Sequence, residues 1–335
     1  MNRTTIVASL TAVALGATLA TGAAPASAHS GRDHGHQHGH GRPATYLLQG
    51  DPVSADNPAG SKFEGIGADQ RRGRFYVSEV TGGEIHRGWA GRAQTEQWLA
   101  GDGTDGRFTA RGITVDAQGR VYIAGGPNGI GTGRPDLWVY DAHGKLLAAL
   151  RAPGEDVFLN DVAIGPDGAA YFTNSNDPQI FRVAPGRGGW RATLWADASD
   201  RIERLPGFNL GGIVLSADRS AFVVAQGNTG KLWRFATRNG AAREVRTDGA
   251  DLVDADGLVR QGSRLTVVRN FSRMIATLRL TRDGRTAVLL GQRASSADRV
   301  LTTAKVLDGR ILYVDSKFDE PVASGPYQVI TDPTR

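Results

Sequence analysis

The stretch Phe63-Glu-Gly-Ile-Gly-Ala-Asp69 returns five more times along the chain in related form. The further copies are Ala110-Arg-Gly-Ile-Thr-Val-Asp116, Leu159-Asn-Asp-Val-Ala-Ile164, Leu210-Gly-Gly-Ile-Val-Leu215, Ala255-Asp-Gly-Leu-Val-Arg260 and Leu301-Thr-Thr-Ala-Lys-Val306. Their central apolar residues, from Ile66 to Ala304, are separated by 47, 49, 51, 45 and 46 residues. Repeats of this length, each with several strands, predict an all-β, six-bladed β-propeller.

The segments between the copies have the pattern of short strands. Alternating β-branched or aromatic residues follow glycine turns, as in Gly119-Arg-Val-Tyr-Ile123 and Gly168-Ala-Ala-Tyr-Phe172. This pattern predicts antiparallel strands joined by hairpins. The end segments 45–49 and 327–331 are the candidates for closing the ring, because each can pair with an otherwise exposed blade edge.

The N-terminal residues are expected to lie outside the fold. Residues 1–28 have the pattern of a secretory signal, with Arg3 before an apolar stretch and Ala26-Ser-Ala28 before the expected cleavage point. Residues 29–44 form a His- and Gly-rich tail that we expect to be disordered. The propeller is then expected over residues 45–335, in a secreted protein that is not inserted in the membrane after signal cleavage.

Composition excludes some functions. The chain has no cysteine, so thiol chemistry and disulfides are excluded. The net charge is +5, but acidic residues are interspersed with the basic ones and no long basic run occurs. A mixed solvated surface is therefore favoured over nucleic-acid binding. Oligomeric state cannot be predicted from these features.

The residue two places before each apolar anchor is polar in most copies. Rotation about a propeller axis places these positions in one ring, which consists of Glu64, Arg111, Asn160, Gly211, Asp256 and Thr302. Two carboxylates and an amide oxygen in one small volume suit a hard cation such as Ca²⁺. The alternative is a polar channel lining that holds water. Arg111 could repel a cation or orient an anionic or hydroxylated substrate, and Asp161 could orient a ligand or accept hydrogen bonds from the next strand.

These motifs resemble a known family. Glu64-Gly-Ile, Asn160-Asp-Val, Asp256-Gly-Leu and Thr302-Thr-Ala are similar to motifs of the gluconolactonase and senescence-marker-protein (regucalcin-like) propellers, especially the secreted actinobacterial branch. The resemblance covers roughly residues 45–332. It implies a divalent cation, commonly Ca²⁺ with Zn²⁺, Mn²⁺ or Mg²⁺ as alternatives, and hydrolysis of a sugar lactone or related ester.

The resemblance also implies roles for individual residues. Glu64, Asn160 and Asp256 match three of the family's metal ligands, and Asp256 is in addition the candidate general base. Arg111, Asp161 and Asn209 are the candidate substrate-binding residues. The family's second ligand asparagine is replaced here by Gly211, and Asn209 could take its place only if the strand entrance bends.

Two functions from different classes follow from these observations. The first is a secreted, divalent-metal-dependent hydrolase of the lactonase type, which the retained Glu64 and Asp256 favour. The second is a non-catalytic extracytoplasmic propeller that binds a small molecule or a protein, which Gly211 favours. In the second case the His-rich tail could bind transition metals.

Overall fold

The computed structural model describes residues 41–55, 57–127 and 134–335. The expected signal (1–28) and residues 29–40 of the expected tail lie outside the described residues. Residues 41–44 lead into the first strand, and Arg42 donates a hydrogen bond to the Asp308 carbonyl at 3.1 Å. Within the described residues, the only helix is a short 3₁₀ turn, η1 (Thr104–Gly106). No described helix could cross a membrane, since none is long and apolar enough.

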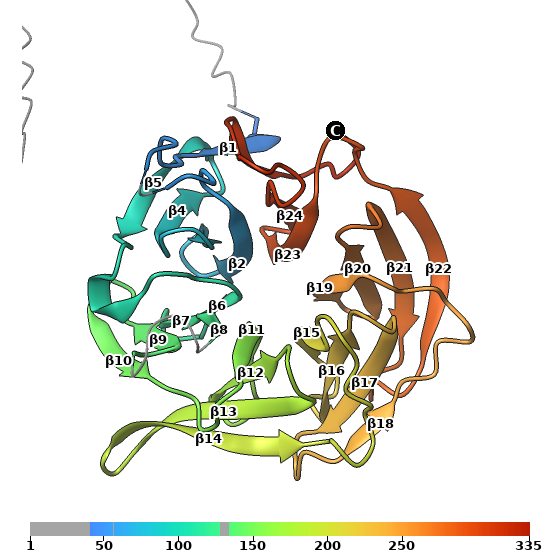
Figure 1. The fold of residues 1–335 in the computed structure, drawn as a ribbon. Helices are drawn as coiled ribbons and strands as arrows, with labels where there is room; N and C mark the ends of the chain where they lie inside the picture. The colour runs from blue at the N-terminus through green and yellow to red at the C-terminus, as the bar shows by residue number, and fades with distance from the viewer. Residues whose placement is uncertain (1–40, 56, 128–133) are drawn as a thin grey trace, which may run out of the picture. The chain divides into compact units, whose positions relative to one another are not determined.

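The described strands form six antiparallel four-stranded units arranged in a ring around a central channel, which confirms the predicted propeller (Figure 1). We number the blades 1 to 6 in chain order. Their innermost strands are, in that order, β2 (Phe63–Asp69), β6 (Ile113–Val115), β11 (Phe158–Ile164), β15 (Leu210–Leu215), β19 (Ala255–Gln261) and β23 (Leu301–Leu307). Each of them contacts the innermost strand of the next blade, and β23 contacts β2.

The other strands follow outward in each blade. The second strands are β3 (Arg74–Glu79), β7 (Val121–Ala124), β12 (Ala170–Asn174), β16 (Ala221–Gln226), β20 (Arg264–Arg269) and β24 (Arg310–Asp315). The third strands are β4 (Ile85–Trp89), β9 (Leu137–Tyr140), β13 (Gln179–Gly186), β17 (Lys231–Ala236), β21 (Met274–Leu280) and β25 (Tyr327–Ile330). The outer strands are β5 (Arg92–Leu99), β10 (Leu146–Leu150), β14 (Gly189–Asp197), β18 (Ala242–Glu244), β22 (Ala287–Ala294) and β1 (Thr45–Leu48). A two-residue strand, β8 (Gly126–Pro127), pairs with β11.

The two chain-end strands close the ring together. β1 pairs antiparallel with β25, so the first strand of the chain becomes the outer strand of the last blade. β1 also makes a parallel bridge to β5, with Leu47 opposite Gln94. The Tyr46 hydroxyl adds a 2.9 Å hydrogen bond to the Ala90 carbonyl of blade 1. Closure therefore joins segments from both ends of the propeller.

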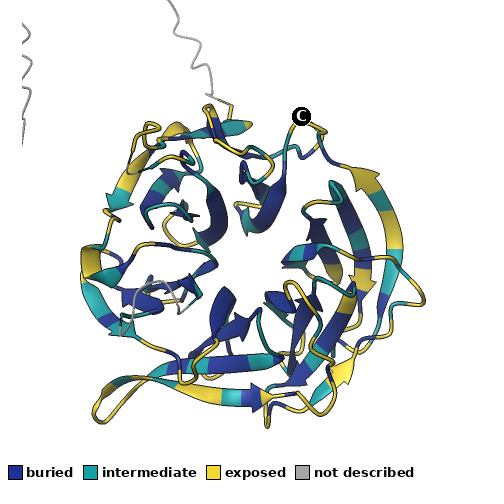
Figure 2. Cartoon of the chain, in the orientation of Figure 1, coloured by how far each residue is buried: buried dark blue, intermediate teal, exposed yellow. Residues whose placement is uncertain are grey.

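The hydrophobic core is divided between neighbouring blades. Six clusters of buried side chains are found among the described residues, and each combines residues of two adjacent blades. In Figure 2 the inner strands are buried or of intermediate exposure, whereas the outer strands carry many exposed positions. Because the core is built from blade-to-blade contacts, the inner strands are held firmly around the channel.

Candidate active site in the central channel

The ring residues lie at irregular points of the inner strands. In β2 the pairing with β3 shifts between Phe63 and Ile66, and the same kind of shift occurs in β11, β15, β19 and β23. Such bulges leave residues unpaired and turn side chains out of the regular alternation. The repeated motif is therefore the sequence of a bulge, which explains why Glu64, Asn160 and Asp256 occupy equivalent places.

The glycine that follows the ring residue allows neighbouring inner strands to approach closely. A Cβ atom on Gly65 would lie 2.0 Å from the Arg111 carbonyl oxygen, and one on Gly212 would lie 2.2 Å from the Asp256 carbonyl oxygen. Larger residues at these positions would push the strands apart. The glycine thus keeps the ring narrow enough for side chains from different blades to meet.

Five of the six ring positions line one cavity at the channel mouth. The cavity has a volume of about 450 Å³, which suits a small organic molecule. It is lined by Glu64, Arg111, Asn160, Gly207, Phe208, Asn209, Gly211, Gly227, Asn228, Asp254, Ala255, Asp256, Asn270, Phe271 and Phe318. Thr302 is the exception, because its hydroxyl is buried and donates to the Glu64 carbonyl at 3.0 Å.

Arg111 is paired with Glu64. Its Nη1 atom donates to Glu64 Oε2, and its guanidinium lies over the Phe158 ring at 4.6 Å from the centroid. The Arg111 Nε atom is buried and has no hydrogen-bond partner among the described residues. Arg111 therefore supplies positive charge to the carboxylate pair in this structure.

The two carboxylates of the ring share one enclosed environment. Burial raises the pKa of Glu64, and the Arg111 guanidinium opposes that rise. Burial also raises the pKa of Asp256 well above its usual range, and the negative charge of Glu64 adds to the effect. Asp256 keeps some accessible surface, but that surface faces the cavity. Two carboxyl groups with raised pKa values therefore lie beside the Arg111 guanidinium. Such an arrangement makes the channel mouth a candidate functional site.

The donor set fits a divalent cation. Glu64, Asn160 and Asp256 together line a small void below the cavity, and they offer only oxygen ligands from carboxylates and an amide carbonyl. The Asn160 side chain makes no hydrogen bond within the described part of the chain, so its amide oxygen is available. A Cβ atom on Gly211 would lie 3.7 Å from Asn160 Oδ1 and 3.6 Å from the Asp256 carbonyl oxygen. The position of Gly211 thus adjoins two of the candidate ligands.

Asp161 bonds to the neighbouring strand. Its Oδ1 atom accepts from the Val162 amide at 2.8 Å, and Oδ2 accepts from the Ile213 amide of β15 at 3.2 Å. Lys305 Nζ lies 3.8 Å from Oδ2. Asp161 lines the lower void but not the larger cavity. Of the two interpretations of Asp161, this geometry favours strand support, and its predicted substrate contact stays a prediction.

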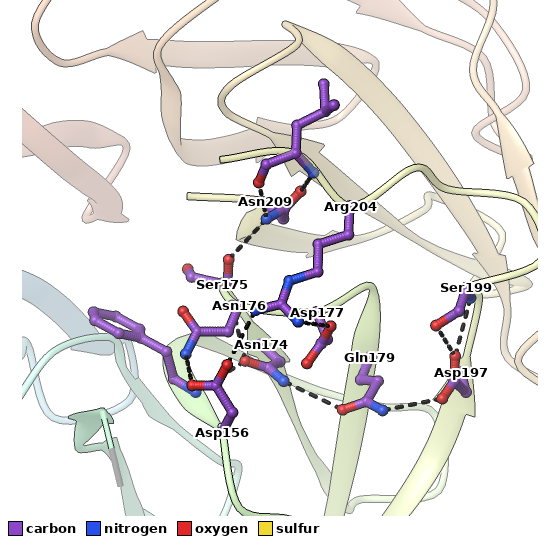
Figure 3. A network of polar contacts seen from close by, with 12 residues as sticks. Asp156, Asn174, Ser175, Asn176, Asp177, Gln179, Asp197, Ser199, Arg204 and Asn209 are labelled. Atoms are coloured by element: carbon purple, nitrogen blue, oxygen red, sulfur yellow. Dashed lines mark hydrogen bonds and ion pairs between the residues drawn. The ribbon is translucent and has the colours of Figure 1, made fainter. Parts of the chain in front are cut away.

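Asn209 lines the cavity, but its side chain holds a loop. Its Oδ1 atom accepts from the Leu205 amide at 3.0 Å, and its Nδ2 atom donates to the Leu205 and Ser175 carbonyls at 2.9 and 3.3 Å (Figure 3). Arg204 ties the same loop to blade 3 through ion pairs with Asp156 and Asp177 at 3.0 and 3.2 Å. Both anchors fix the loop that carries Phe208 at the cavity rim.

Sequence reasoning missed several residues around the cavity. Asn270 donates to Asp256 Oδ2 at 2.9 Å, and the residues Phe208 and Phe271, which line the cavity, are about half exposed, at 54% and 50%. Asn270 and Phe271 directly follow β20, whose last residue, Arg269, pairs with Ala255 beside the ring. Polar residues at the ends of second strands were the signal that could have located them.

Fold and site together define the protein as a six-bladed β-propeller with an acidic, oxygen-rich channel mouth. No protein-family model matches the sequence, and no curated protein matches it either. The comparison with solved structures is therefore what relates this chain to known proteins.

Three solved structures illustrate the likeness. A gluconolactonase from Xanthomonas campestris is 19% identical, with a TM-score of 0.56 over 87% of this chain and 98% of that chain. Regucalcin from Agrobacterium tumefaciens, described as a calcium-binding protein, is 16% identical, with a TM-score of 0.55 over 82% and 92%. Virginiamycin B lyase from Staphylococcus aureus is 14% identical, with a TM-score of 0.54 over 81% and 80%. The resemblance drawn from the sequence is thus confirmed in the fold.

Proposed function

We propose that this protein is an exported, divalent-cation-dependent hydrolase of lactones or related esters. The observation that carries the proposal is that Glu64, Asn160 and Asp256 line both one small void and a cavity of about 450 Å³. The likeness to a gluconolactonase supports a lactone substrate, and the likeness to a calcium-binding propeller supports Ca²⁺ as the cation.

The cation would be held by Glu64, Asn160 and Asp256. Ca²⁺ is favoured because all three side chains offer oxygen, and Mg²⁺, Mn²⁺ or Zn²⁺ are the alternatives. A bound divalent cation supplies polarisation of a substrate carbonyl oxygen and stabilises the negative charge that develops there. Water would complete the coordination at the position that Gly211 leaves open.

Asp256 acts as the general base in this proposal. Burial and the negative charge of Glu64 raise the pKa of Asp256, and a cation bound beside it would lower that pKa again, so that the carboxylate is ionised and can accept a proton. Asn270 holds Oδ2 by a hydrogen bond, so the carboxylate has a fixed orientation, and Oδ1 makes no hydrogen bond within the described residues. The Oδ1 atom is thus free to take a proton from an attacking water molecule.

Arg111 and the aromatic rim bind the substrate. The guanidinium retains donors beyond the one that contacts Glu64, and these suit the hydroxyl or carbonyl oxygens of a sugar lactone. Phe208, Phe271 and Phe318 present apolar surface to the same cavity, on which the flat face of a sugar ring can stack. They also reduce the access of bulk water.

The test is an assay of sugar-lactone hydrolysis, in which the acid produced is measured as proton release in weakly buffered solution. We expect activity in Ca²⁺, loss in chelator, and a fall in kcat of about 10²-fold or more in Asp256→Asn. Asp248→Asn is the control, since Asp248 is an exposed aspartate that pairs with Arg246 and does not line the channel cavity. Equal activity of wild type and Asp256→Asn would remove the proposed base.

A non-catalytic binding protein is the second candidate. It is favoured by the missing amide oxygen at Gly211 and by the ion pair that engages Glu64. Binding of a sugar lactone, measured by calorimetry, without turnover in any tested divalent cation would favour this function.

The role of the His-rich tail is tested separately. Loss of transition-metal binding on deletion of residues 29–42 would show that the tail contributes. Export itself is tested by whether the secreted product begins at His29.

A further inference from the structure

A second group of acidic side chains joins the loop after β1 to blade 1, outside the residues that line the channel cavity. Asp51 belongs to the loop after β1, Glu84 to the turn between β3 and β4, and Asp102 to the loop after β5. One carboxylate oxygen of each lies within 4.8 Å of the corresponding oxygens of the other two. Three segments that are separate in the sequence therefore bring carboxylates to one point.

Glu84 is buried and incompletely bonded. Its residue is 3% exposed, and its Oε2 atom is closed to solvent with no hydrogen-bond partner in the described part of the chain. The carboxylate fits against two glycines, since a Cβ atom on Gly82 or on Gly101 would lie 2.4 Å from one of its oxygens. A buried carboxylate oxygen without a partner is costly, because it has lost water and gained no donor.

The group also lacks a balancing cation. No lysine, arginine or histidine of the described residues forms an ion pair with Asp51, Glu84 or Asp102. The nearby carboxylate of Glu79 adds further negative charge, although His86 and Thr81 engage it at 3.3 and 3.1 Å. Burial, followed by the charges of Glu79, Asp102 and Asp51, raises the pKa of Glu84 to about 7.

We propose that Asp51, Glu84 and Asp102 form a second Ca²⁺ site, separate from the channel. Ca²⁺ binds oxygens at about 2.3–2.6 Å, so ligands on opposite sides of the ion lie up to about 5 Å apart. The separation of up to 4.8 Å agrees with that value. Mg²⁺ binds at about 2.0–2.1 Å and usually keeps several of its waters, so a group of three carboxylates suits Ca²⁺ better.

The site stabilises the closure of the ring. β1 pairs with β25 of the last blade, and Asp51 lies three residues after the end of β1. Glu84 and Asp102 belong to blade 1. A Ca²⁺ ion shared by these residues therefore links the loop after the closing strand to the first blade. This role is structural and does not depend on hydrolysis in the channel.

Calcium binding to the full chain tests the site. We compare Asp256→Asn, which removes a channel ligand, with the double variant Asp256→Asn/Glu84→Gln, by calorimetry and thermal unfolding. The first variant is expected to keep one Ca²⁺ site with a rise in Tm of about 5 °C at a Ca²⁺ concentration of 100 times the Kd, and the double variant is expected to lose both. Ca²⁺ is the probe because histidine nitrogens of the tail do not suit it.

Two further variants guard against effects on folding. The first is Asp102→Asn. Asp102 is exposed and has a φ of 51°, which asparagine tolerates, so this variant should fold and should lose Ca²⁺ binding at this site. Asp248→Asn, with a φ of 52°, is the matched control and should bind as before. In chelator, Glu84→Gln should be at least as stable as its parent, because it removes an unpaired buried charge. The same number of bound Ca²⁺ ions with and without Glu84→Gln would overturn the proposal, whatever the result for the channel.

Discussion

Arg111 and Glu64 form an ion pair across two neighbouring blades, at the place where a channel cation would also bind Glu64. Arg111 Nη1 donates to Glu64 Oε2, and Phe158 supports the guanidinium from one side. A cation and Arg111 therefore compete for the same carboxylate. The channel site therefore differs from a metal site in which no ligand oxygen is already engaged by a side chain of the protein.

The competition predicts opposite effects for Arg111→Met. Methionine keeps the packing on Phe158 but removes the charge. In chelator we expect a loss of about 1–3 kcal/mol in the free energy of unfolding, because Glu64 is left buried without its partner. In Ca²⁺ we expect a larger rise in Tm than in wild type. A smaller rise, measured by thermal unfolding at neutral pH, would show that the pair does not oppose cation binding.

Gly211→Asn should strengthen the channel site. The space at Gly211 admits a Cβ atom at ordinary contact distances of 3.6 and 3.7 Å, so the side chain can be added without moving a strand. One more oxygen ligand should lower the Kd for Ca²⁺ roughly tenfold, which is about 1.4 kcal/mol. Gly211→Ala is the matched control because it fills the space without an oxygen. Equal Kd values for the two variants in calorimetry would contradict this role for position 211.

Asp136 should make stability depend on pH. It is buried, its Oδ1 accepts from the Ala152 amide at 2.8 Å, and its Oδ2 has no partner among the described residues. Burial raises its pKa to about 6. Because the folded state binds the proton more tightly, the associated stability is present below about pH 4 and is lost as pH rises through 6.

The measurement is urea unfolding of wild type and Asp136→Asn between pH 4 and 7. The free energy of unfolding of wild type should fall relative to the variant by up to roughly 3 kcal/mol over this range. A difference that stays constant with pH would mean that Asp136 titrates normally in the folded protein.

Asn209→Ala should lower the stability of the fold more than it weakens substrate binding. The side chain holds the loop of Leu205 and Phe208 through hydrogen bonds to Leu205 and Ser175. Removing a buried group with several hydrogen bonds should cost about 2–4 kcal/mol. Unchanged Tm with an increased KM would instead support the direct substrate contact that the sequence suggested. Asn228→Ala is a useful comparison, since Asn228 also lines the cavity and bonds to Asn209 at 3.2 Å.

The sequence predicted the parts of the site that depend on repetition. The column from Glu64 to Thr302 could be found because five of the six blades have the same kind of bulge at the start of the inner strand. Asn270 and Phe271 could not be found in this way, because they follow a second strand and have no counterpart in the repeated motif. Their position beside Asp256 depends on the pairing of two strands and the path of a loop.

By itself, the sequence determined the propeller architecture, the number of blades and the ring of side chains at the channel. Each of these follows from a local pattern of buried and polar residues that recurs with the blade. Only the tertiary structure decided that Arg111 pairs with Glu64, that Asn209 holds a loop, and that Asp51, Glu84 and Asp102 meet. Contacts of this kind depend on ring closure and on how closely neighbouring strands approach, and no periodicity in the sequence encodes those distances.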